Sequence, residues 1–160
     1  MRIATTLLGV LAAAALLALP ASAQSLERKA IGLADAKKIA AAAEAEARRN
    51  SWTMVIAICD EGGNLIYLEK LDDTQIGSIE IAQAKAATAA RMKRPTKALE
   101  DAIAGGRNAV LGLPGITPVE GGLPVIVDGK VIGAIGVSGG TSAQAGQVAQ
   151  AGLDAAGLRK

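Results

Sequence analysis

The chain has 160 residues, with 17 lysines and arginines against 15 aspartates and glutamates, and no histidine. The absence of histidine excludes Ser-His-Asp triads, imidazole general bases and histidine zinc sites, and the single cysteine excludes a thiolate zinc site. The balanced charge, with Trp52 and Tyr67 as the only aromatic residues, argues against a nucleic-acid partner.

The N-terminus has the pattern of a cleavable secretion signal over residues 1–23. Arg2 precedes an apolar run over residues 7–19, and Ala21-Ser22-Ala23 provides the small residues that signal peptidase requires. The apolar run is about 13 residues long and a membrane span needs about 20, so a retained anchor is the weaker alternative. We expect no stable membrane insertion and a mature domain over residues 24–160, exported to the periplasm or the extracellular space.

The first half of the mature domain predicts a helix followed by a hairpin. Small apolar residues recur at helical spacing over residues 33–50, with Asp35 placed to cap the start and Asn50 to end the helix. Two β-rich runs follow, at residues 53–59 and 65–71, separated by a glycine-containing turn. We expect these two runs to pair as antiparallel strands.

An alanine-rich helix is predicted next, over residues 76–92. Because it is small on nearly all sides, other backbones can approach it closely, and we expect it near the centre of the assembly. Pro95 follows the helix and suits the first turn of a short third helix. Residues 105–122 are glycine-rich and predict an irregular segment with a short helix around residues 108–111.

The last third of the chain carries the clearest hairpin, with strands over residues 124–127 and 130–137. Asp128-Gly129 between two β-branched runs favours a type I′ turn. Gly136 in the second strand marks a close approach of another element. A final helix over residues 142–156 begins with a threonine and a glutamine at capping-box spacing.

The order helix, hairpin, helix, short helix, hairpin, helix predicts one α+β domain. Adjacent hairpins imply antiparallel pairing, so we expect a single antiparallel sheet built from two hairpins and flanked by helices.

The alanine-rich helix offers a candidate ligand-binding stripe. Lys85, Thr88 and Met92 lie on one helical face and bring together an ammonium, a hydroxyl and a thioether. Lys85 is either a solvated lysine or an anchor for a carboxylate at the rim of a small pocket.

Other polar or reactive residues have simpler interpretations. Cys59 follows a buried apolar run and is a core residue, with a thiolate ligand or an intersubunit bridge as alternatives. Asp60 beside two glycines is a turn residue. The pair Asp72 and Asp73 either binds a cation or begins the segment before the second helix, and two adjacent carboxylates are a weak metal signal.

Several motifs, in order along nearly all of the mature chain, resemble the GlcG/HbpS family, also called the haem-degrading domain family. They lie at residues 33–36, 57–65, 77–89, 94–96, 121–124 and 128–139. The resemblance implies an α+β domain that assembles into dimers and higher oligomers, often octamers. Some members are exported haem-binding proteins that serve redox sensing or degrade haem slowly. Others are fused to corrinoid adenosyltransferases or are encoded in glycolate-utilisation operons.

The chain departs from the family pattern at two points. Members that ligate haem through histidine are not models for it. An acidic residue that usually follows the Ser-Gly pair near the last helix is also missing, and Ala145 and Gly146 occupy that stretch.

The leading hypothesis is an exported homo-oligomer, from dimer to octamer, that binds haem or a related tetrapyrrole. Two alternatives remain: an accessory protein or enzyme of small hydroxy-acid metabolism that holds a carboxylate, and a structural oligomer without a small ligand. No catalytic residue and no metal ligand is assigned. The candidate ligand-binding residues are Lys85, Thr88 and Met92, with Gly121, Gly122 and Pro124 shaping the wall of the pocket.

Overall fold

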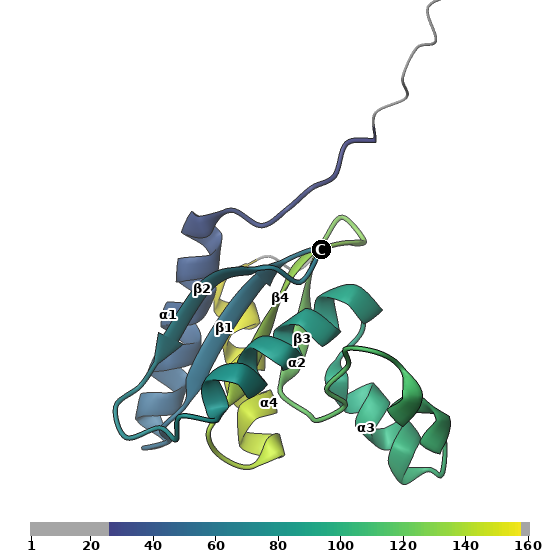
Figure 1. Cartoon of the computed structure of the whole chain (residues 1–160). Helices are drawn as coiled ribbons and strands as arrows, with labels where there is room; N and C mark the ends of the chain where they lie inside the picture. The colour runs from purple at the N-terminus through teal and green to yellow at the C-terminus, as the bar shows by residue number, and fades with distance from the viewer. Residues whose placement is uncertain (1–25, 158–160) are drawn as a thin grey trace, which may run out of the picture.

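A computed structural model describes residues 26–157 and shows one α+β domain (Figure 1). The elements are α1 (Leu33–Arg49), β1 (Val55–Asp60), β2 (Leu65–Lys70), α2 (Ser78–Met92), α3 (Thr96–Ala104), the 3-10 helix η2 (Asn108–Gly112), β3 (Gly122–Val127), β4 (Lys130–Ser138) and α4 (Ser142–Ala155). This order confirms the predicted fold class. The proposed secretion signal at residues 1–23 lies outside the described residues, and no helix within them is long and apolar enough to cross a membrane.

The sheet has the strand order β2-β1-β4-β3, and every neighbouring pair is antiparallel. The two hairpins therefore join along β1 and β4, the first and last strands in sequence. In the second hairpin Asp128 and Gly129 both have positive φ, at 51° and 70°, as a type I′ turn requires. In the first, Asp60 accepts hydrogen bonds from the backbone of Gly62 and Asn64, which confirms it as a turn residue.

The central strand β1 shows how the two faces of the sheet are covered. Ile56 and Ile58 face a core shared with α1 and α4, while Val55, Ala57 and Cys59 face α2. In Figure 1, α1 and α4 lie behind the sheet and α2 crosses its front, with α3 and the following segment extending to one side. Six of the eight buried residues in the two clusters on the α2 side are alanines, and the backbone of α2 lies directly against Gly136 of β4.

The predicted N-terminal cap is correct for α4 and wrong for α1. Thr141 and Gln144 form the predicted capping box at the start of α4. The prediction that Asp35 caps α1 is wrong. Extended Gly32 is the N-cap, and Asp35 sits in the first turn, paired with Lys38 at 3.1 Å.

Candidate functional site

The stripe predicted on α2 faces the segment that leads from η2 into β3. Lys85 is only 3% exposed, and its Nζ donates to the carbonyl oxygens of Glu120 at 2.8 Å and Val137 at 3.2 Å. The interpretation of Lys85 as a solvated lysine is therefore wrong. Its ammonium instead ties α2 to β4 and to the approach of β3.

The charge of Lys85 is held in a partly desolvated setting. Burial lowers the pKa of the Lys85 ammonium, and the nearby carboxylates of Glu100 and Glu120 oppose that effect. The two glutamates are linked, since the Glu120 amide donates to Glu100 Oε2 at 2.5 Å. The Glu120 side chain also lies over Gly146, where a Cβ would come within 2.6 Å of Oε1. The glycine that departs from the family pattern thus leaves room for this carboxylate.

Thr88 lies one turn further along α2 and anchors the same segment. Its hydroxyl donates to the Ala84 carbonyl at 2.7 Å and accepts from the Thr117 amide at 2.8 Å. Both capacities of this buried hydroxyl are used within the protein.

Gly121 and Gly122 carry the chain across the stripe. Gly121 has φ +121°, and a Cβ there would lie 2.8 Å from the Val137 carbonyl oxygen and 3.1 Å from Lys85 Nζ. At Gly122 a Cβ would lie 2.5 Å from the Lys85 carbonyl oxygen, and its amide donates to Thr96 Oγ1 at 2.9 Å. The structure therefore brings Lys85, Thr88, Gly121 and Gly122 together, but in a packed junction.

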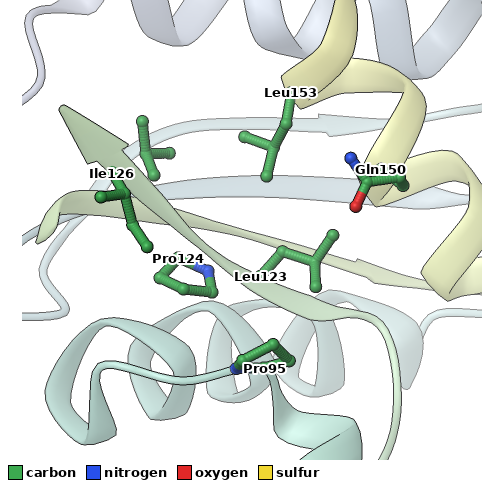
Figure 2. A pocket seen from close by; sticks show the side chains of 7 residues that line it. Pro95, Leu123, Pro124, Ile126, Gln150 and Leu153 are labelled. Carbon is green, nitrogen blue, oxygen red and sulfur yellow. The ribbon is translucent and has the colours of Figure 1, made fainter. Parts of the chain in front are cut away.

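Met92 and Pro124 lie apart from this junction. Met92 is half-buried at the end of α2, beside exposed Arg91, Lys93 and Arg94. Pro124 lies on the edge strand β3 and lines a cavity of about 220 Å³ between β3 and the end of α4. Figure 2 shows that its wall is apolar except for one amide. The other lining residues are Pro95, Leu123, Val125, Ile126, Gln150 and Leu153.

Sequence reasoning missed the partners that close the junction around Lys85. Glu100, Glu120 and Thr117 lie outside the motifs named above, and the motif at residues 94–96 gives no indication of the partner of Thr96. Each of these four residues makes its contact in the junction with a residue 20 or more positions away in sequence. The sequence contained one partial signal for this junction: the glycines at positions 121 and 122 indicate a close approach of backbones, but they do not identify the partners.

We expect Thr88→Val to loosen the segment around residue 117. The change keeps the shape of the side chain but leaves the Thr117 amide without its acceptor, at a cost of about 1–2 kcal/mol. Hydrogen exchange should accelerate at Thr117 by on the order of tenfold, while amides in the β1–β4 ladder keep their rates. Unchanged exchange at Thr117 would show that the hydroxyl does not hold this segment.

Cys59 is a core residue, as the sequence indicates. It is 2% exposed, and burial raises the pKa of its thiol to about 12. It lies at the base of a cavity of about 190 Å³ between the β1–β2 turn and α2, with Gly63, Leu65, Gln83, Ala84, Ala86 and Ala87. A thiolate ligand at neutral pH is not favoured here.

We therefore expect Cys59 to be unreactive in the folded protein. At pH 8, a thiol-reactive disulfide reagent should take hours or longer to modify Cys59 in the folded protein. In guanidinium chloride the same reaction should finish within seconds to minutes. Stoichiometric modification of the native protein within minutes would contradict this assignment.

Comparisons with known proteins point to one family. A family model described as "Haem degrading protein HbpS-like" matches residues 31–154. Protein GlcG of Escherichia coli K12 is 47% identical over 103 residues, which cover 64% of this chain and 77% of that protein.

Two solved structures are similar in fold and sequence. The Klebsiella pneumoniae protein ORFY has a TM-score of 0.78 and 34% identity, covering 86% of this chain and 97% of its own. A PduOC–haem complex has a TM-score of 0.72 and 29% identity, covering 79% of this chain and 94% of its own.

Proposed function

The chain belongs to the HbpS-like family of haem-degrading proteins, and from this premise we propose that it binds haem or a closely related tetrapyrrole. The observation that carries the proposal is the similarity to a domain solved in complex with haem, over 79% of this chain. Family membership alone leaves the residues that hold the ligand to be argued from this chain.

The side chains available in this chain narrow the choice of a residue that would ligate the haem iron. The chain has no histidine, Cys59 is a buried neutral thiol, and the Lys85 and Thr88 side chains are engaged by backbone groups. Thioether and phenol groups are known haem ligands. Tyr67 donates to Glu69 at 3.1 Å, which leaves half-buried Met92 as the better candidate.

The surroundings of Met92 suit the rest of a haem molecule. Arg91, Lys93 and Arg94 are exposed around it, and Arg91 Nε is held on the Gly62 carbonyl at 2.9 Å. Guanidinium and ammonium groups pair well with carboxylates such as haem propionates. When bound, haem supplies the redox chemistry of its iron, so any degradation with peroxide would be chemistry of the cofactor.

The cavities described on this chain, at 190–320 Å³, are at or below the lower end of the range for ligand pockets. A tetrapyrrole would therefore lie against the surface near the end of α2, where a second copy can cover it. We propose on this basis that the working form is a homo-oligomer, and, from the secretion signal expected at residues 1–23, that it is exported.

Titrating haem into the protein while recording the Soret band tests this function. We expect a saturable shift at micromolar haem. Met92→Leu, which conserves volume, should weaken binding by on the order of tenfold, about 1.4 kcal/mol, and move the band. Met54→Leu is the matched control, because Met54 is fully buried in the core on the other face of the sheet. Haem dimethyl ester should bind less tightly than haem if the cations hold the propionates.

Three results would redirect the proposal. No Soret shift at micromolar haem would end it. A normal shift in Met92→Leu would remove Met92 from the ligand set and leave haem binding intact. Thermal stabilisation by small hydroxy acids, without any effect of haem, would favour the alternative role in small-acid metabolism.

A further inference from the structure

A third cavity lies on a different part of the molecule, where the α1–β1 and β2–α2 connections meet. It measures about 320 Å³ and is independent of the α2 stripe and of the haem proposal. We call it the Trp52 cavity, because it includes the single tryptophan of the chain. It is lined by Arg48, Ser51, Trp52, Thr53, Leu71, Asp72 and Asp73.

Hydrogen bonds hold the walls of the Trp52 cavity in place. The Trp52 amide donates to the Ala47 carbonyl at 2.9 Å, which fixes the backbone of Trp52 at the end of α1. The Leu71 amide donates to the Met54 carbonyl at 2.9 Å, and the buried Thr74 hydroxyl donates to the Leu71 carbonyl at 2.8 Å. A ligand would therefore meet a largely preformed site, which lowers the entropy cost of binding.

The electrostatic setting of the cavity favours a positive charge. Helix α1 ends at this cavity and brings the partial negative charge of its C-terminus there. Two of the lining residues, Asp72 and Asp73, carry carboxylates. The hydrogen bond and charge of Glu44, and then the charges of Asp72 and Glu69, raise the pKa of the Arg48 guanidinium. Glu44 and Glu69 thus add to the negative field around the lining carboxylates.

The cations near the cavity are already engaged. Arg48 pairs with Glu44 at 2.6 Å, and Arg49 pairs with the buried Glu46. The Lys70 ammonium donates to the Leu71 carbonyl at 3.3 Å. Among the residues that line the Trp52 cavity, Asp72 and Asp73 are acidic and only Arg48 is basic. Because Arg48 is already paired with Glu44, the lining carries an excess of negative charge.

We propose that the Trp52 cavity binds a small organic cation, namely a quaternary or protonated alkylammonium group. An indole attracts such a cation and its alkyl substituents, and the carboxylates supply the opposite charge. A bare metal ion fits less well, because no cluster of three or more acidic or thiol ligands occurs among residues 26–157. The volume suits a molecule of a few carbon atoms around the nitrogen.

Trp52 itself provides the measurement, since its fluorescence is the only indole signal of the chain. We expect choline or tetramethylammonium chloride to change the Trp52 emission saturably, at constant ionic strength kept with sodium chloride. tert-Butanol, a neutral molecule of similar shape, should cause no saturable change. Glycine betaine, which carries a carboxylate, should bind less tightly than choline.

Variants assign the effect to the cavity. Asp72→Asn and Asp73→Asn together should weaken choline binding by about fivefold to tenfold. Asp101→Asn on α3 removes one carboxylate that does not line the cavity and should have no effect. Trp52→Leu should abolish the saturation transfer from the protein to the choline methyl protons in NMR, and circular dichroism confirms that each variant is folded.

Several outcomes would overturn the proposal. One is a linear emission change that sodium chloride reproduces. Another is equal binding of tert-butanol, which would make the cavity merely apolar. Tighter binding of betaine than of choline would indicate that Arg48 recognises an anion. Undiminished binding in the doubly substituted Asp72 and Asp73 variant would place the cation elsewhere.

Discussion

Gly136→Ala is expected to destabilise the domain by about 4 kcal/mol or more, which is among the largest effects of any single methyl group in the chain. Gly136 lies two residues before the end of β4, where it pairs with Ala57 of β1 on one side and Gly122 of β3 on the other. A Cβ at this position would come within 2.1 Å of the Ala82 carbonyl oxygen and 2.5 Å of the Ala86 amide nitrogen. Both are backbone atoms of α2, so no side-chain rotation relieves the overlap.

The added methyl group forces α2 away from the sheet. That movement would separate Ala82, Ala86 and Ala89 from the strands they contact and loosen a core built from small side chains. Each alanine buries little apolar area, so a small displacement of α2 removes much of its contact with the sheet. The loss of stability therefore exceeds the cost of placing the methyl group alone.

Thermal unfolding followed by circular dichroism measures this effect. For a domain of this size we expect the Tm to fall by about 10 °C or more. Gly77→Ala is the matched control, because a Cβ there meets no atom within 4 Å and Gly77 already has helical φ and ψ of −58° and −22°. A Tm for Gly136→Ala within a few degrees of that control would show that α2 is free to shift.

Features encoded by neighbouring residues were predictable from the sequence. The Asp128-Gly129 turn and the capping box at Thr141 depend on two to four adjacent residues, and both are confirmed. The hairpins fixed the antiparallel pairing, from which the fold class followed. Asp35 failed as a cap because α1 begins earlier, at an extended Gly32 that has no capping side chain to mark the start in the sequence.

The surroundings of the α2 stripe were not predictable in the same way. Helical spacing placed Lys85 and Thr88 on one face, but it could not identify what covers that face. Their partners Glu120, Val137 and Thr117 lie 35, 52 and 29 residues further along the chain. Only the tertiary fold decides whether a helical lysine meets solvent, a ligand or a carbonyl oxygen.

The second large effect is expected at Lys85. Lys85→Met keeps most of the apolar stem but removes the donor that satisfies the Glu120 and Val137 carbonyls, so we expect a loss of about 2–4 kcal/mol. Lys97→Met is the matched control. Lys97 is exposed, and its single ion pair with Asp101 should contribute little to the free energy of unfolding.

The pH dependence of the free energy of unfolding provides a second test of the burial of Lys85. Because burial lowers the pKa of Lys85 in the folded state, the unfolded chain binds more protons between that lowered pKa and the ordinary value of 10.5. The stability of the parent protein, measured relative to Lys85→Met by urea unfolding, should therefore rise with pH across that interval. The pKa of Lys97 is raised by its hydrogen bond to Asp101. The stability of the parent protein relative to Lys97→Met should therefore fall as the pH rises above 10.5.

The same variant decides whether Lys85 is an anchor for an anionic ligand or a structural tie between α2, β4 and the start of β3. A structural tie predicts lower stability and faster hydrogen exchange around residues 117–122, with haem affinity changed only as far as the fold loosens. A ligand anchor predicts near-normal stability and a selective loss of affinity for carboxylates. Since both acceptors of the ammonium are backbone carbonyls within the protein, we expect the first pattern. Normal stability of Lys85→Met together with weakened carboxylate binding would contradict it and return Lys85 to the binding site.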